Sequence, residues 1–312
     1  MCGIAGIIYK NRSGSVGTVG RDMTNMLQAM KHRGPDSTGY ALYGEPNDLL
    51  VMRFKLADPN DGHDFSYSLR LARSRREVEA RLSKIGATID RVEGESEYAY
   101  RATFRYEGEL KPLADYVEDV PGAEVLSLGY SLEIIKDLGD AETVAEQYRL
   151  DAFHGTHAIG HVRMATESDV DIAGAHPYWA YPFSDVAVVH NGQLTNYHQW
   201  RRRLERYGHR FQSECDSEII AVYLAQSMAD GLPLETAMKQ SLEDLDGVFT
   251  YLVVTQDQLG MAKDEMAAKP LVLHEGEDVV VLASEEGAIR AVMSQEIDSY
   301  DPYEGEVMVW SR

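Results

Sequence analysis

Residues 49–150 carry strand and helix signals in the order β-α-β-β-α-β. Apolar residues at helical spacing, including Leu71, Val78 and Leu82, predict an amphipathic helix, and Gly94 separates the two strands that follow it. This order is the split-βαβ pattern of a ferredoxin-like unit, so we expect a small α+β lobe inserted at 49–150. Its predicted strands are Leu49–Leu56, Ala87–Val92, Tyr98–Tyr106 and Glu124–Leu128, and its predicted helices are Leu69–Ile85 and Lys111–Glu118.

The chain on both sides of this segment contains many short strand signals and clustered helix signals. Such a mixture predicts stacked sheets flanked by helices, an α+β fold. We expect a main domain formed by residues 2–48 and 151–312. Its predicted strands are Cys2–Tyr9, His157–Arg163, Val186–His190, Thr250–Thr255, Leu259–Ala262, Leu271–His274 and Val279–Ala283, and its predicted helices are Arg21–Lys31, Tyr197–Tyr207, Ser217–Ala229 and Leu234–Leu245.

The charge balance excludes several classes of partner. The 312 residues include 51 acidic and 30 basic ones, a net charge of −21. This charge disfavours nucleic acid, whose phosphates need Lys and Arg, and it is repelled by anionic membrane surfaces.

No apolar run in the sequence approaches the roughly 18 residues of a membrane span, and we find no signal peptide. The two cysteines, Cys2 and Cys215, do not form a disulfide scaffold. We expect a cytoplasmic protein.

Cys2 follows the initiator methionine directly. Once Met1 is removed, the thiol lies a few bonds from a free α-amine, whose ordinary pKa of about 7.7–8 suits a general base. A nucleophile paired with its own terminal amine is a known means of activation. A small residue at position 2 is also common for no catalytic reason, so Cys2 needs support from other motifs.

Five motifs in order supply that support. They are Met1–Gly6 (MCGIAG), His32–Gly39 (HRGPDSTG), Gly160–Thr166 (GHVRMAT), His190–Asn196 (HNGQLTN) and Ser213–Glu218 (SECDSE). The set resembles the class II glutamine amidotransferases, which are glutaminases with an N-terminal nucleophile. The resemblance covers about residues 2–44 and 154–286 and skips the insertion. It implies the four-layer αββα sandwich of the N-terminal nucleophile (Ntn) hydrolases for the main domain.

The resemblance also implies the roles of individual residues. Cys2 would attack the side-chain amide of glutamine, while the side chain of Asn191 and the backbone N–H of Gly192 would form the oxyanion hole. Arg163 would bind the α-carboxylate of the substrate, where a planar guanidinium is suited, and Asp216 would bind the α-ammonium group.

Three further residues are placed beside the substrate by the same resemblance. Arg33 begins the segment Arg33–Gly39, which resembles the family's loop that closes over glutamine. His176 resembles a family position next to the substrate, and Thr166 belongs to the third motif. The sequence departs from many relatives at Met164, where they carry Trp, and at Glu167-Ser168, where they carry His-Gly.

Each site residue also has an ordinary structural interpretation. Asp216 could cap the helix that follows it, Asn191-Gly192 is a hairpin turn signal, and Arg163 could face solvent on an alternating strand. The joint occurrence of the motifs favours the catalytic interpretation. We expect Cys215 to be a buried apolar thiol.

The sequence predicts no metal site. His154, His157 and His161 follow one another at spacings of three and four on a predicted strand. Because side chains alternate between the two faces of a strand, these three histidines do not share a face.

The end of the chain at Arg312 predicts that ammonia is used by another chain, since little sequence follows the glutaminase motifs. The stand-alone size resembles the amidotransferase subunits of glutamate-synthase-like complexes, such as the small subunit of N-methylglutamate synthase and the GlxB-type proteins. Flavin (FMN) and iron–sulfur centres would then belong to the partner subunits, and we expect no cofactor in this chain.

Two alternatives remain open at this stage. One is a regulatory or binding subunit that keeps the fold without catalysis, which a retained Met1 would favour because it blocks the amine. The other is an Ntn hydrolase that acts on a different amide. The pair Arg163 and Asp216 argues against the second alternative, because an apolar substrate needs no matched charges for an amino-acid head group.

Overall fold

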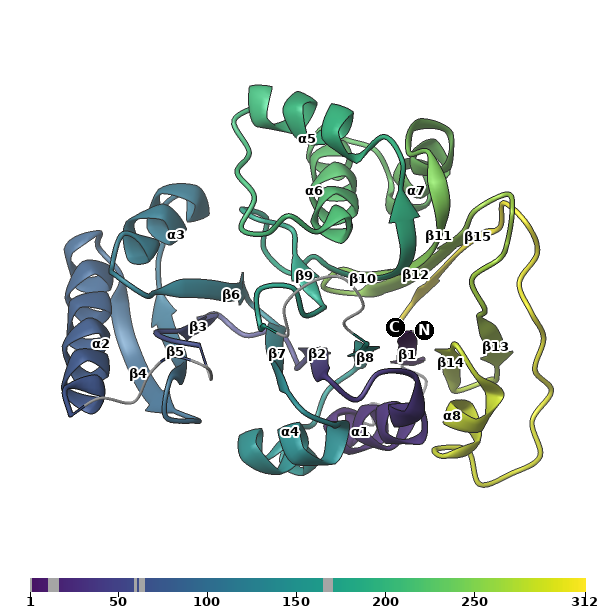
Figure 1. Cartoon of the computed structure of the whole chain (residues 1–312), viewed down its shortest axis with the longest axis horizontal. Coiled ribbons are helices and arrows are strands. Elements are labelled where there is room, and N and C mark those ends of the chain that lie inside the picture. Colours follow the sequence, from purple (N-terminus) through teal and green to yellow (C-terminus); the bar gives the residue numbers. More distant parts are fainter. Residues whose placement is uncertain (1, 11–16, 59–60, 62–64, 165–170) are drawn as a thin grey trace.

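The computed structural model describes residues 2–10, 17–58, 61, 65–164 and 171–312 (Figure 1). Its central layer is a six-stranded antiparallel sheet with the order β13-β14-β1-β8-β2-β7. All but the last residue of β1 are buried, because helices cover one face of this sheet and a second sheet covers the other. The strands are β13 (Val272–Glu275), β14 (Val279–Ala283), β1 (Gly3–Tyr9), β8 (His157–Arg163), β2 (Ser37–Tyr43) and β7 (Leu132–Leu138).

The second sheet has five antiparallel strands in the order β15-β12-β11-β10-β9. Its apolar face packs on the first sheet through side chains such as Leu252, while Ile4, Ile159 and Leu282 lie in the same core. A Cβ at Gly6 would lie 3.0 Å from Leu252, which shows how closely the sheets approach. The strands are β15 (Val307–Ser311), β12 (Gln258–Lys263), β11 (Gly247–Val254), β10 (Ala187–Leu194) and β9 (Tyr178–Trp179).

Helices form the two outer layers (Figure 1). The apolar residues Met23, Met26 and Leu27 of the first helix are fully buried against the six-stranded sheet. This layer contains α1 (Val19–Ala29), α4 (Ala141–Tyr148) and α8 (Glu286–Arg290), and the opposite layer contains α5 (Tyr197–Arg206), α6 (Asp216–Ala229) and α7 (Leu234–Asp244). The four-layer αββα sandwich predicted from the resemblance is therefore confirmed.

The inserted lobe has the predicted element order and lies at the left of Figure 1. Its four-stranded antiparallel sheet has the order β4-β5-β3-β6, so β5 lies between β3 and β4 as a split-βαβ unit requires. Leu71, Val78 and Leu82 of its long helix are buried, as their spacing predicted. The elements are β3 (Leu50–Lys55), α2 (Tyr67–Lys84), β4 (Thr88–Gly94), β5 (Ala99–Arg105), α3 (Leu110–Glu118) and β6 (Glu124–Gly129).

The lobe ends earlier than residue 150, the boundary expected from sequence. Strand β7 pairs with β2 along its whole length, and α4 packs against α1, so both belong to the main domain. The turn before β7 is fixed by the Asp185 carboxylate, which accepts the backbone N–H groups of Tyr130, Ser131 and Leu132 at 2.8–2.9 Å. The expected boundary is corrected to the turn after Gly129 because these contacts join the chain to the central sheet.

In the part of the chain that the structure describes, no helix combines the length and apolar character needed to cross a bilayer.

Candidate active site

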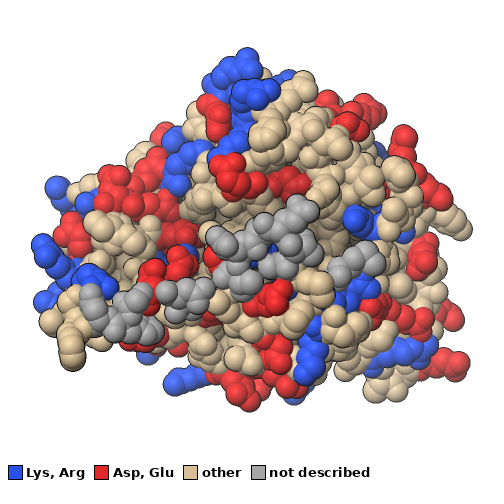
Figure 2. Space-filling view, in the orientation of Figure 1, with Lys and Arg blue, Asp and Glu red and all other residues tan. Residues whose placement is uncertain are grey.

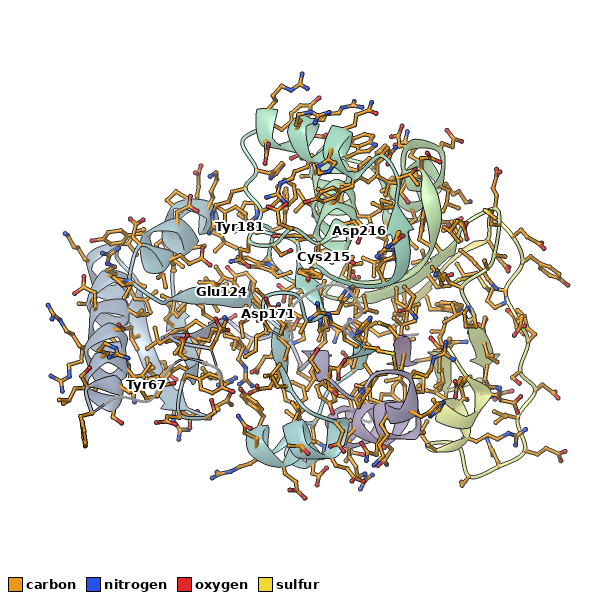
Figure 3. All side chains as sticks on the ribbon, in the orientation of Figure 1. Tyr67, Glu124, Asp171, Tyr181, Cys215 and Asp216 are labelled. Carbon is orange, nitrogen blue, oxygen red and sulfur yellow. The ribbon has the colours of Figure 1, made fainter. Side chains whose placement is uncertain are left out.

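A cavity of about 720 Å³ opens where β8 ends and where β1 and α6 begin. Figure 3 shows Asp171, Cys215 and Asp216 near the centre of the molecule, well separated from Tyr67 on the lobe. Seven of the residues predicted from sequence line this cavity: Cys2, Arg33, Arg163, His176, Asn191, Gly192 and Asp216. The eighth, Thr166, lies outside the described residues, as does Met1.

Cys2 lies half-buried immediately before β1. Its Sγ accepts the backbone N–H of Met164 at 3.4 Å. Its carbonyl oxygen accepts the Nε–H of Arg33 at 3.1 Å, and a salt bridge from Arg33 to Glu285 holds that guanidinium in place. The backbone of Cys2 is therefore anchored on the cavity wall with its sulfur facing the cavity.

Asn191 and Gly192 lie inside β10 and pair with Thr250 and Phe249 of β11. They are therefore not a hairpin turn. Gly192 has a φ of +141°, and a Cβ there would lie 2.1 Å from the Val248 carbonyl oxygen, so only glycine fits. The Nδ2 of Asn191 donates to the carbonyl oxygen of Cys2 at 3.2 Å, which brings this amide beside the nucleophile.

Arg163 is the last residue of β8, and its side chain is only 11% exposed. Its guanidinium lies 3.9 Å from the Asp171 carboxylate. A Cβ at Gly174 would lie 2.7 Å from the guanidinium, so that glycine makes room for it. Arg163 therefore lines the cavity and does not face bulk solvent, which was the alternative suggested by the alternating pattern of its strand.

Asp216 is the first residue of α6, and Cys215 occupies the N-cap position. Its carboxylate accepts the backbone N–H of Leu194, a residue of β10, at 2.7 Å. It therefore does not cap its own helix, which was the structural alternative. Its Oδ1 lies 3.6 Å from the Nδ1 of His190 and faces the cavity wall.

Three buried histidines, which were not expected to lie together, form the wall beside these residues. The rings of His161 and His176 stack with 4.1 Å between centroids, and His190 lies 6.5 Å from His176. Burial lowers the pKa of His161 to about 3 and also lowers the pKa values of His176 and His190, so all three rings are neutral at pH 7. They come from three separate segments, so no local sequence pattern could reveal the cluster.

Cys215 packs against the apolar core around α6, as expected from sequence, but it is only partly buried and its surroundings also include polar groups. It lines the cavity, and its Sγ lies 3.4 Å from the Ser217 Oγ and 3.8 Å from the Asp216 Oδ1. The polar start of α6 surrounds it, which the sequence did not indicate. Burial raises the pKa of the Cys215 thiol, so it stays protonated at neutral pH.

The segment Arg33–Gly39 resembles a closing loop in sequence, but only its first part is a loop in the structure. Arg33 ends a 3-10 turn at Lys31–Arg33, and β2 already begins at Ser37. Asp36 donates its N–H to the Arg163 carbonyl oxygen at 3.2 Å, so the segment packs on the end of β8. The cavity is further lined by Lys269 and Pro270.

Among the described residues, the structure contains no group of three or more His, Cys, Asp or Glu side chains arranged to hold a metal ion. His157 instead stacks on Tyr43 and contacts the Thr255 carbonyl oxygen at 2.7 Å.

Comparisons with known proteins identify the family of the chain. A family model described as a glutamine amidotransferase domain matches residues 161–291. A Methanothermobacter thermautotrophicus protein described as a glutamine amidotransferase is 41% identical, over 99% of this chain and 99% of its own length. The glutamine amidotransferase-like protein GlxB of Rhizobium meliloti is 34% identical, over 99% of this chain and 98% of its own length.

Solved structures show the same fold at low sequence identity. Glutamine phosphoribosylpyrophosphate amidotransferase from B. subtilis matches with a TM-score of 0.61 and 19% identity, over 99% of this chain. This chain spans 47% of that protein, about half its length. The full-length relatives and the family model show that the chain belongs to the class II glutamine amidotransferases.

Proposed function

We propose that this chain is a glutaminase subunit in which Cys2 hydrolyses glutamine through a thioester and a partner synthase receives the ammonia. One observation carries the first half of this proposal. Cys2, the Asn191-Gly192 pair and the charged residues Arg163 and Asp216 all line one cavity. A nucleophile, neutral donors and one charge of each sign are the groups that a zwitterionic amino acid with a neutral side-chain amide requires.

The reaction balances with the residues of this chain. After Met1 is removed, the α-amine of Cys2 takes the thiol proton and Sγ attacks the amide carbon of glutamine. The resulting ammonium returns a proton to the departing nitrogen as the C–N bond breaks, which releases ammonia and leaves a thioester. Water then attacks the thioester, giving glutamate and the free thiol.

Asn191 and Gly192 stabilise the oxyanion of each tetrahedral intermediate. The Asn191 Nδ2 now donates to the Cys2 carbonyl oxygen at 3.2 Å and to the Ser284 Oγ at 3.3 Å, so it already lies beside the reacting sulfur. Because both N–H groups of this amide are used in these two bonds, one of them turns from its present acceptor to the substrate oxygen, where it stabilises the developing charge.

The head group of glutamine is held by Arg163 and Asp216. The planar guanidinium of Arg163 suits the α-carboxylate, and the carboxylate of Asp216 suits the α-ammonium. His176 supports this end of the cavity from behind. Arg33 is engaged with Cys2 and Glu285, so we propose that it positions the nucleophile in addition to contacting substrate. Thr166 remains a predicted substrate contact.

The partner is the second half of the proposal. Free ammonia is protonated in water and loses its nucleophilicity, so a sealed route to an acceptor site is chemically favourable. Similarity to GlxB over nearly the full length of both chains supports a stand-alone amidotransferase subunit of a cytoplasmic, glutamate-synthase-like or N-methylglutamate synthase-like complex. In such a complex FMN and iron–sulfur centres belong to the partner subunits.

The chemistry is tested by the intact mass of the purified chain before and after treatment with a diazo-ketone analogue of glutamine. We expect loss of the Met1 mass and a single adduct on Cys2, and we expect Cys2→Ala to abolish both labelling and glutamine hydrolysis. Cys215→Ala is the matched control, because it removes the other cavity thiol and should leave labelling intact. Turnover that survives Cys2→Ala would disprove the mechanism, and retained Met1 without an adduct would favour a non-catalytic subunit.

The partner is tested by tagging the chain in its native cells and purifying it at low ionic strength. We expect copurified subunits whose visible absorbance reports flavin and iron–sulfur centres. Glutamine-dependent amination of an acceptor should be lost with Cys2→Ala and restored by ammonia. A tagged chain that is fully active in glutamine hydrolysis and purifies alone would contradict this half of the proposal.

A further inference from the structure

The hydroxyl of Ser217 lies at the centre of a polar cluster behind the cavity. Its Oγ is 2.8 Å from the His190 Nδ1, 3.2 Å from the His176 Nε2 and 3.4 Å from the Asp216 Oδ1. Ser217 is 1% exposed, and both rings are buried. The cluster therefore joins two neutral imidazoles to the one carboxylate that we assign to the α-ammonium group.

The proton positions follow from the contacts of each ring. The His176 Nδ1 accepts the backbone N–H of His190 at 3.3 Å, so the neutral His176 ring carries its proton on Nε2 and donates it to Ser217. The Ser217 oxygen accepts this bond and still has one proton to donate. The Cys215 sulfur, 3.4 Å away, is only a weak acceptor, so that proton goes either to His190 or to Asp216.

The buried edge of His190 decides between the two. Its Nε2 is buried without a hydrogen-bond partner in the described part of the chain. If Ser217 donated to His190, the neutral ring would carry its proton on this Nε2, leaving a buried N–H unsatisfied. If the His190 Nδ1 donates to Ser217, only a lone pair is left unsatisfied, and the hydroxyl proton goes to the Asp216 anion.

We propose that Ser217, oriented by His176 and His190, is the positioning residue that fixes the Asp216 carboxylate for recognition of the substrate α-amino group. The Leu194 N–H holds Oδ2 and the Ser217 hydroxyl holds Oδ1, so the plane of the carboxylate is set from both oxygens. The chain thereby selects α-amino acids over amides that lack the amine. This inference rests on the role proposed above for Asp216.

The test compares glutamine with glutaramate, which has the same amide but no α-amine. We expect Ser217→Ala to raise the KM for glutamine about 10-fold, as loss of one hydrogen bond to a charged group would, with kcat nearly unchanged. The KM for glutaramate should stay unchanged, because that substrate does not use Asp216. Asp216→Ala should show the same pattern with a larger effect, and Ser217→Thr, which keeps the hydroxyl, should restore selectivity.

Ser241→Ala is the matched control. Ser241 is also a fully buried helical serine, but its hydroxyl bonds Met238 and Tyr251 away from the cavity. Ser241→Ala should leave the KM for glutamine and the KM for glutaramate unchanged, even if the free energy of unfolding falls. Equal changes for both substrates in Ser217→Ala, or a glutamine-selective change in Ser241→Ala, would overturn the proposal.

A second readout separates this inference from the proposed function. Calorimetric affinities for glutamine and glutaramate are measured in the Cys2→Ala background, with and without Ser217→Ala. Loss of preference for glutamine in the double variant supports the inference, and an unchanged preference overturns it. If the wild-type chain bound glutamine selectively but did not hydrolyse it, the glutaminase proposal would fail while this result would still hold.

Discussion

The main domain and the inserted lobe each carry a cavity, and the two cavities are similar in size. The main-domain cavity has a volume of about 720 Å³, and the lobe cavity, between α2 and the segment after α3, has about 840 Å³. The lobe cavity is larger and is lined by arginines such as Arg73 and Arg81. Volume alone would therefore favour the lobe cavity as the functional site.

The polar groups of the two cavities differ in how they are held. In the lobe, Arg81 pairs with Glu77 one helical turn away, and the Glu77 side chain is 53% exposed. Surface pairs of this kind contribute little free energy and fix little geometry. In the main domain, Ser217, His176 and His190 are buried and bonded to one another. Burial thus fixes polar groups that converge from distant segments in the main domain, whereas basic and acidic side chains lie intermixed on the surface of the lobe, at the left of Figure 2.

Among the variants that test this contrast between the two cavities, we expect Asn191→Ala to change turnover most. Loss of one oxyanion donor should lower kcat by about 10²–10³-fold with little change in KM, because the donor acts on charge that develops after binding. Steady-state glutaminase kinetics measure this directly. Gln193→Ala, a neighbour that also lines the cavity, is the control and should retain nearly full kcat. A change in KM alone would assign Asn191 to ground-state binding instead.

Local patterns predicted the lobe well and the central sheet less well. Helix α2 and strands β4 and β5 are neighbours in sequence, so the spacing of Leu71, Val78 and Leu82 and the turn at Gly94 were sufficient. Strands β2 and β7 were not predicted, because their defining contacts are with each other across about 100 residues of chain. In β2, Ser37-Thr38-Gly39 gives no alternating apolar signal, yet all its residues are buried between two covering layers.

In the site, too, local motifs predicted some residues, while others depend on contacts between distant segments. The sequence predicted Cys2, Arg163, Asn191, Gly192 and Asp216 because motif and chemistry agreed at single positions, and all five line one cavity. Ser217 and His190 lay within those motifs without an assigned role, and His161 was considered only as a metal ligand. Their function depends on distances between β8, β10 and α6, which no spacing along the chain encodes. Physical proximity, rather than residue type, was the missing information.

We expect the smallest effect on turnover from a variant at the contact between the main domain and the inserted lobe. Glu133 on β7 accepts hydrogen bonds from Arg53 at 2.7 Å and from Arg101 at 2.8 Å, so it links the central sheet to β3 and β5 of the lobe. Its side chain is only 7% exposed. Burial by itself would raise the pKa of Glu133, but the two guanidinium groups hold it below its ordinary value of 4.5.

Glu133→Gln should therefore lower the free energy of unfolding by about 3 kcal/mol while kcat and KM of the folded enzyme stay within about 2-fold. The variant removes a buried carboxylate from the buried Arg53, which keeps Glu95 as a partner, and from the half-buried Arg101. Urea titration and glutaminase assays on the same samples measure both quantities. The exposed Glu77→Gln is the control, with an expected change below about 0.5 kcal/mol.

The pKa of Glu133 is depressed in the folded state, so the difference in unfolding free energy between the wild type and Glu133→Gln depends on pH. This difference should be complete above about pH 4.5 and shrink as the pH falls through the lower pKa of the folded state. A large loss of kcat at unchanged stability would instead make the contact between the main domain and the lobe part of the catalytic machinery and break the contrast between the two regions.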